Sequence, residues 1–396
     1  MSRLWSAWHN GAPERPATSS LKVLLEGLAL LTLAFLITLL LLEGGVRLVR
    51  PQDPDVYNSE KFLRLYPAPG EPQTLVPNSV GNYSGVPVRI NSIGLRDREV
   101  GVPKPANVFR VLAIGDSVTF GFGVRVEESY PKRLETLLNA AGGSSTKRFE
   151  VINAGVPATG LVSYLQYLET KGPLLEPDLV LVGIVLNDIM DYDAVSAGGN
   201  SQNRHSRLRQ WLSELNRALL LHSHLYLLVY MRAKSIAYQT GAADFSAAYE
   251  FDFLAVQPPS DRQERAWKSS LTRLNQLVDA ARQPGVPLVL VVFPEEIQLN
   301  ARELDLYRRT LRLTLDNSPL DGIPQRRLTE FARVHQVPLV DLLPRFRESH
   351  TSPLFLRNRA ISHDWVHPSP AGHAAAAEEI HAALRRLELL APSGKR

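Results

Sequence analysis

Five short apolar runs, separated by stretches with helical periodicity, constrain the fold of this chain most strongly. The third run is apolar throughout, whereas a strand exposed on one face would alternate apolar and polar residues. Buried strands that alternate with helices are typical of a parallel sheet covered on both faces. The expected strands are Val108–Ile114, Val151–Asn153, Leu179–Leu186, Val286–Phe293 and Val337–Leu342. We therefore predict an α/β fold, a three-layer α/β/α sandwich around a five-stranded parallel sheet.

Helical patterns fill the intervals between these runs. Helices are expected near Tyr130–Ala140, Arg265–Arg282 and Pro324–Val334, and a final helix begins at Pro370 after the N-cap residue Ser369. The long interval 191–261 carries an amphipathic pattern (Leu208, Trp211, Leu212, Leu215, Leu219) and then the apolar run Leu225–Tyr230. We interpret it as a helical insertion that adds a layer packed on the sheet. A substrate lid or a membrane-touching element is the alternative.

The N-terminal region contains an uncharged, Leu-rich run, Gly27–Leu42. These 16 residues cover about 24 Å as a helix, and their apolar flanks bring the length near the roughly 30 Å of a bilayer core. Glu-Gly-Gly-Val-Arg follows in place of a small-x-small cleavage site, so we predict an uncleaved transmembrane anchor over residues 21–50. A buried core helix is the alternative, disfavoured because Leu occupies every face.

Basic residues on either side of this run weakly indicate its orientation. Three precede it and two follow it: Arg3, Arg15 and Lys22, then Arg47 and Arg50. The difference favours a cytoplasmic N-terminus and an extracytoplasmic main domain. Residues 1–20 are expected to be a disordered tail, 51–105 a small β-rich prelude with turns at Asn82 and Ser92–Gly94, and 106–391 the main domain.

Composition excludes several classes of protein. The 44 basic and 40 acidic side chains leave a net charge of +4, and no basic stripe is interleaved with aromatic residues, so we expect no nucleic-acid partner. The absence of cysteine excludes disulfides, thiolate metal sites and a cysteine nucleophile. His222 and His224, two apart on an expected helix, do not share a face and predict no metal site. Glu295 and Glu296 are interpreted as solvated surface carboxylates, with substrate contact as the alternative.

A serine follows the first expected strand in Gly115-Asp116-Ser117. The carboxyl ends of strands are where open α/β sheets bind ligands, and a helix-start N–H beside Ser117 can stabilise an oxyanion. Ile114–Val118 is not G-x-S-x-G, so the nucleophile elbow of α/β-hydrolases is not indicated. A serine nucleophile needs a base, and the base needs an orienting partner. Asp364-Trp365-Val366-His367 offers both within one turn, although an isolated D-x-x-H is usually structural.

Oxyanion donors are expected from two further strand ends. Asn187 directly follows the third strand, and Gly155 follows the second and has no side chain to block its backbone N–H. For Asn187 a turn or helix cap is an equally good interpretation.

Together these motifs resemble the SGNH, or GDSL-like, hydrolases. GDS, NAG, ND and DWVHP occur in the order of that family, over roughly Val108–Leu387. The resemblance implies that Ser117 is nucleophile and oxyanion donor, that Gly155 and Asn187 are the other donors, and that His367 is the base oriented by Asp364. The family's third block usually has glycine two residues before the asparagine, where this chain has Val185. We expect the sheet to have flavodoxin-like strand order.

Two flanking stretches, Arg89–Glu99 and Thr119–Tyr130, look more loosely like membrane-anchored bacterial members found with surface-polysaccharide systems. The expected function is a membrane-anchored serine hydrolase that cleaves an acyl ester, acetyl foremost, of a small molecule or glycan. It would need no cofactor and no metal. Two alternatives remain: an O-acetyltransferase acting on a surface or secreted polysaccharide, and a non-catalytic glycan-assembly module. The oligomeric state is left open.

Overall fold

The computed structural model describes residues 17–52, 61–64, 72–141, 148–189, 207–240, 260–311, 317–349, 353–357 and 364–390. Most of the expected N-terminal tail lies outside these residues, and from Ala17 onward the chain is already helical. The central sheet is parallel and has the order β6-β5-β7-β8-β9. Its strands are β5 (Val108–Gly115), β6 (Arg148–Gly155), β7 (Leu179–Ile184), β8 (Leu288–Val292) and β9 (Leu339–Asp341). The five-stranded, flavodoxin-like prediction is confirmed.

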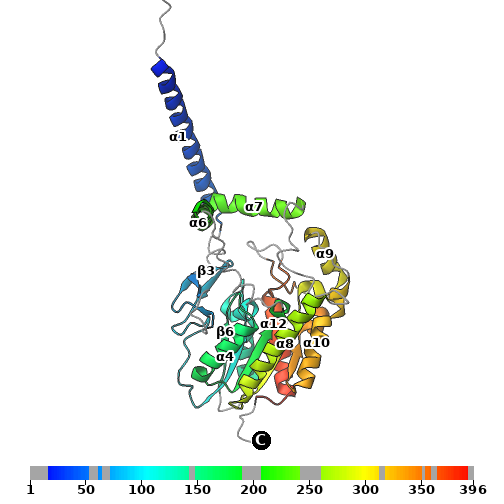
Figure 1. The fold of residues 1–396 in the computed structure, drawn as a ribbon. Coiled ribbons are helices and arrows are strands. Elements are labelled where there is room, and N and C mark those ends of the chain that lie inside the picture. The colour runs from blue at the N-terminus through cyan, green and yellow to red at the C-terminus, as the bar shows by residue number, and fades with distance from the viewer. Residues whose placement is uncertain are drawn as a thin grey trace, which may run out of the picture.

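Helices cover both faces of this sheet (Figure 1), because side chains of every strand alternate between two apolar clusters. Leu112 and Ile114 of β5 pack toward α4 (Leu161–Leu175), α8 (Asp261–Arg282) and α10 (Ile323–Val334). Val111 and Ala113 pack toward α3 (Tyr130–Ala141) and α12 (Pro370–Arg386). The shorter elements are α2 (Ser117–Phe120), η3 (Val126–Glu128), η4 (Leu186–Ile189), η7 (Glu296–Gln298), α9 (Ala301–Leu311), η8 (Ser318–Asp321) and α11 (Leu343–Glu348).

Four short strands precede the sheet. They form two antiparallel pairs, β1 (Leu63–Arg64) with β2 (Thr74–Leu75) and β3 (Val80–Tyr83) with β4 (Val86–Arg89). The turn of the second pair lies at Ser84 and Gly85, both with positive φ, so the expected turn at Asn82 is wrong. Asn82 lies inside β3. The apolar side chains of these strands share one cluster with Phe120 and Val156, so the prelude packs directly on the main sheet's loops.

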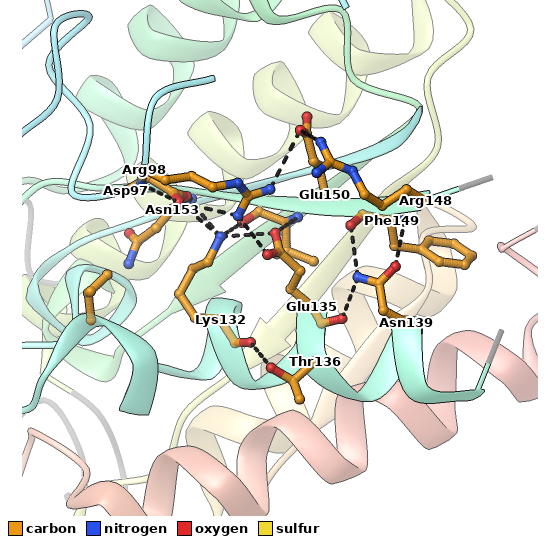
Figure 2. A network of polar contacts seen from close by, with 12 residues as sticks. Asp97, Arg98, Lys132, Glu135, Thr136, Asn139, Arg148, Phe149, Glu150 and Asn153 are labelled. Carbon is orange, nitrogen blue, oxygen red and sulfur yellow. Dashed lines mark hydrogen bonds and ion pairs between the residues drawn. The ribbon is translucent and has the colours of Figure 1, made fainter. Parts of the chain in front are cut away.

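A polar network also ties the prelude to the sheet (Figure 2). Asp97 accepts the backbone N–H of Asn153 (3.0 Å) and pairs with Lys132 of α3 (2.9 Å). Arg98 pairs with Glu135 (2.6 Å) and with Glu150 of β6 (3.5 Å). These charges belong to the stretch Arg89–Glu99, whose role in this structure is to hold the prelude against β6 and α3.

The first helix, α1 (Ala17–Val49), extends away from the body (Figure 1). From Lys22 to Val49 it is long and apolar enough to cross a membrane, a test that a signal sequence also passes. None of the side chains in its most apolar stretch is buried. The alternative of a buried core helix is therefore excluded.

The described part of the insertion, residues 207–240, forms two helices, α6 (Arg207–His222) and α7 (His224–Thr240), at the end of α1 (Figure 1), and its flanks lie outside the described residues. The expectation that these helices pack on the sheet is wrong. Trp211, Leu212 and Leu215 are exposed, and the turn between the helices is bonded to the end of α1. The physical reason is that other helices already cover both faces of the sheet, so no apolar face of the sheet is left for α6 and α7.

Candidate active site

Ser117 lies at the carboxyl end of β5, as the first residue of the single turn α2. Asp116 precedes this turn, and its carboxylate accepts the N–H of Val118 (2.8 Å) and lies 3.3 Å from the Ser117 hydroxyl. The turn ends at Gly121, whose φ of 84° is one that side-chain-bearing residues rarely adopt. Burial raises the pKa of Asp116. The local sequence thus exposes a serine hydroxyl at the sheet edge on a tightly held turn.

His367 and Asp364 reach this hydroxyl from the other end of the chain. His367 Nε2 lies 2.8 Å from Ser117 Oγ, and His367 Nδ1 lies 2.7 Å from Asp364 Oδ2. The other oxygen of Asp364 accepts the backbone N–H groups of Val366 and His367, each at 2.9 Å. The structure therefore brings together the serine, imidazole and carboxylate that the sequence singled out, in the order needed for proton transfer.

Backbone hydrogen bonds hold the loop that carries His367 at His367 itself and at Ser369. Leu356 donates its N–H to the His367 carbonyl (3.0 Å), and Ser369 donates its N–H to the Leu354 carbonyl (2.8 Å). Ser369 also caps α12, as expected, by accepting the N–H groups of Ala371 and Gly372. The ring of Phe122 lies against the imidazole, with centroids 4.4 Å apart. These contacts fix the position of the imidazole.

The charges around His367 and Asp364 favour an imidazole that can accept a proton. Burial works against protonation of His367, but the Asp364 carboxylate and its hydrogen bond outweigh burial and raise the pKa of His367. Burial likewise opposes the charge on Asp364, yet the charge of His367 and the hydrogen bonds that Asp364 accepts lower its pKa. Asp364 therefore remains ionised while the imidazole changes charge.

Asn187 lies in η4, immediately beyond β7. Its side-chain oxygen is buried and has no hydrogen-bond partner in the described part of the chain. The next residue, Asp188, holds the turn: it accepts the Val185 N–H (2.9 Å) and the Tyr164 hydroxyl (2.9 Å). Val185 itself is fully buried, so the departure from glycine at this position is accommodated in the core.

Gly155 ends β6 beside α2, but its N–H donates to the side chain of Asn153 (3.1 Å). Its expected role as an oxyanion donor stays a prediction, which requires this N–H to turn from Asn153 to the substrate. What requires glycine here is space, because a Cβ would lie 2.1 Å from the backbone nitrogen of Phe120.

The same loop contains a residue that the sequence did not reveal. Ala158 has a φ of 59°, and it is exposed although its neighbours are buried. A left-handed non-glycine residue is uncommon and concentrates at functional sites. An alanine gives no sequence signal of a left-handed conformation.

The interpretation of Glu295 and Glu296 as solvated carboxylates is wrong, since they are only 3% and 4% exposed. Glu296 bonds to Tyr307 and pairs with Arg357, and its N–H donates to the Trp365 carbonyl (2.8 Å). For Glu295, burial and then the nearby Asp364 raise the pKa to about 8. Glu296 therefore supports the loop that carries Asp364, whereas Glu295 is buried near that carboxylate.

Arg96 is a second residue missed from the sequence. It is fully buried, and its guanidinium donates to the carbonyls of Phe120 (3.0 Å), Gly121 (2.5 Å) and Val124 (2.7 Å). It thus holds the segment after Ser117. The run RINSIGLRDRE contains this arginine, but its charge alone does not distinguish a buried arginine from a solvated one.

Among the described residues no group of three or more His, Asp or Glu side chains could hold a metal ion. His224 Nδ1 accepts the N–H of Gln52 (2.8 Å), and the carbonyl of His222 accepts from Arg47 (2.8 Å). These histidines therefore connect helices.

A hydroxyl, an imidazole and a carboxylate in series, at the carboxyl edge of a parallel sheet, form the arrangement that activates a serine for acyl transfer. Residues 113–375 match the model of the GDSL-like Lipase/Acylhydrolase family, and the chain belongs to that family.

Solved structures of similar fold include a catalytic mutant of Axe2, an acetylxylan esterase from Geobacillus stearothermophilus. It is 18% identical, with 69% of this chain and 93% of that chain covered and a TM-score of 0.38. A lipolytic protein of the G-D-S-L family from Desulfitobacterium hafniense DCB-2 is 12% identical, with 70% and 99% covered and a TM-score of 0.36. A search of curated proteins returned no match.

Proposed function

We propose that this chain is a membrane-anchored serine esterase that cleaves a short acyl ester, acetyl foremost. Ser117 is the nucleophile, His367 the general base and Asp364 the residue that orients it. The observation that carries this proposal is the pair of contacts at 2.8 Å and 2.7 Å linking the three side chains. Membership of an acylhydrolase family supports it.

In the proposed mechanism, His367 Nε2 takes the proton of the Ser117 hydroxyl while Oγ bonds to the ester carbonyl carbon. The oxyanion is stabilised by the Ser117 N–H and the Asn187 side-chain amide, and by the Gly155 N–H once that N–H leaves the Asn153 side chain. The imidazolium then protonates the leaving alcohol, and the carbon–oxygen bond to that alcohol breaks. Water repeats the sequence on the acyl-serine, which releases the acid and restores the enzyme.

The proposed substrate is an acylated small molecule or glycan, reached by an extracytoplasmic body tethered through α1. The basic residues around the anchor support this orientation weakly. Phe122, whose ring lies on the imidazole and contacts Tyr83 edge-on at 5.5 Å, supplies an apolar surface beside the base.

The test uses the full chain in detergent with a series of p-nitrophenyl esters from acetate to long chains. We expect hydrolysis of acetate foremost, and no activity in Ser117→Ala. A fluorophosphonate probe should label the wild type and not the variant. Absence of labelling in folded protein would refute the esterase and favour a non-catalytic module. Transfer of acetyl to an added oligosaccharide in preference to water would identify an O-acetyltransferase with the same residues.

A further inference from the structure

The helices α6 and α7 meet at a turn that is bonded to the end of α1. The Glu43 carboxylate accepts the Ser223 hydroxyl (2.9 Å) and the backbone N–H groups of His224 (2.9 Å) and Leu225 (2.8 Å). It thereby satisfies N–H groups that the first turn of α7 leaves without a helical partner, and its charge suits that helix end. One carboxylate of the anchor thus caps α7.

Arg47, one turn further along α1, holds α6. Its guanidinium donates to the carbonyl of His222 (2.8 Å), at the end of α6, and pairs with Glu43 (2.6 Å). A cation at a helix carboxyl end is favourable for the same reason that an anion suits the other end. The two helices and the end of α1 therefore form one joint.

The joint sets the direction of both helices relative to α1. Figure 1 shows α7 lying across the end of α1, between α1 and the body. A helix that spans a bilayer ends at the lipid–water boundary, so a helix fixed crosswise at that end lies along the membrane surface.

The exposed surface of this pair carries apolar side chains where a soluble protein would place polar residues. Trp211, Leu212 and Leu215 form a stripe on α6 and are 57%, 48% and 39% exposed, while Leu220 on another side of the helix is buried. On α7, Val229 and Ile236 are exposed seven residues apart, on one face. Tryptophan and leucine beside polar residues are typical of helices that lie in the lipid interface.

The charge of the pair suits an anionic surface. Within residues 207–240 there is one acidic residue, Glu214, against five basic ones: Arg207, Arg209, Arg217, Arg232 and Lys234. Basic side chains close to anionic lipid are attracted to its headgroups.

We propose that α6 and α7 lie on the surface of the bilayer that α1 crosses, with the Trp211–Leu215 stripe among the lipid headgroups and acyl ends. The proposal rests on the proposed anchoring by α1. It orients the body: α12 begins beside the active-site loop and ends on the side away from α1 and α7 (Figure 1). The active-site edge consequently faces the membrane, and esters held at that surface are its nearest substrates.

Single-cysteine variants of the full chain test this, because the natural chain has no cysteine. Leu215→Cys places a fluorescent label on the stripe, Ser213→Cys is the matched control on another face of the same helix, and Leu36→Cys reports insertion of α1. Each variant is reconstituted in vesicles of phosphatidylcholine and phosphatidylglycerol in equal parts. Quenching by nitroxide lipids and by aqueous iodide is then measured.

We expect nitroxide lipids to quench positions 36 and 215 at least about threefold more than position 213, with iodide showing the reverse order. Equal access of iodide to 215 and 213, with 36 in lipid, would overturn the inference and leave the anchor intact. Failure of lipid quenching at 36 would refute the anchor and the inference together. Protection of 215 from both quenchers would show that protein, such as a second copy, covers the stripe, and would also overturn it.

Discussion

Replacing Asp364 by asparagine separates orientation of the imidazole from folding of its loop. In the native site, one oxygen of Asp364 faces His367 Nδ1 at 2.7 Å, and the other accepts two backbone N–H groups at 2.9 Å. The asparagine oxygen can keep the two backbone bonds, which leaves its NH₂ group facing Nδ1. Two donors cannot bond, so the imidazole must carry its proton on Nε2. That nitrogen is the one that should accept the proton of Ser117.

The expected loss is about 10⁴-fold in kcat, the size seen when this change is made in another serine triad. At about 1.4 kcal/mol per tenfold, this corresponds to about 5.5 kcal/mol of transition-state stabilisation. KM should change little, because in the proposed mechanism Asp364 does not touch the substrate. Asp364→Ala should also lose stability, by about 1–3 kcal/mol, since the backbone N–H groups lose their acceptor.

The assay is release of p-nitrophenol from p-nitrophenyl acetate by the full chain in detergent, beside a thermal unfolding curve of each variant. Asp305→Asn, at a half-exposed carboxylate on α9, is the matched control and should retain native kcat. A kcat within about tenfold of the native value in a folded Asp364→Asn protein would contradict the tautomer argument.

Four further outcomes follow from the same contacts. Native kcat/KM should rise with pH through an apparent pKa above the ordinary histidine value near 6.5, because the neutral base is required and the pKa of His367 is raised; a pH-rate profile checks this. Glu295→Gln should flatten the pH dependence of the melting temperature. The native pKa of about 8 exceeds the unfolded value near 4.5, so the folded state holds the extra proton and stability falls between these values by about 1.4 kcal/mol per pH unit. Arg96→Met should lower the free energy of unfolding by about 3 kcal/mol in a denaturant titration, because three buried carbonyls lose a donor. Ala158→Gly should raise stability by about 1 kcal/mol in the same titration, by relieving a left-handed φ.

The sheet and the meeting of Ser117 with His367 were predictable because both follow from rules that span the whole chain. Short continuous apolar runs rich in Val and Ile, such as Leu179–Ile184, favour strands buried on both faces, and parallel strands bring their carboxyl ends to one edge. A motif placed directly after such a strand is thereby located in space, even when its partner is 250 residues away.

The details that the sequence left open or predicted wrongly depend on the partner to which each polar group bonds. Gly155 has an N–H at the expected edge, but the side chain of Asn153, two residues earlier, accepts it. Glu296 follows a strand and would ordinarily be solvated, yet Arg357, 61 residues later, pairs with it. Pairing between distant charges leaves no periodic signal, so a sequence pattern predicts the position of such groups and not their state.

The insertion shows the same limit for apolar surface. The spacing of Trp211, Leu212 and Leu215 correctly indicates a helix with one apolar stripe, but it contains nothing about what the stripe meets. Glu43 and Arg47 held the missing information, because the charges that end the apolar run of α1 are also the caps of α7 and α6. A charged residue at the end of a membrane-length helix therefore has two interpretations. It marks the point where the helix meets water, or it bonds to another helix. Only the positions of His222 and His224 distinguish them here.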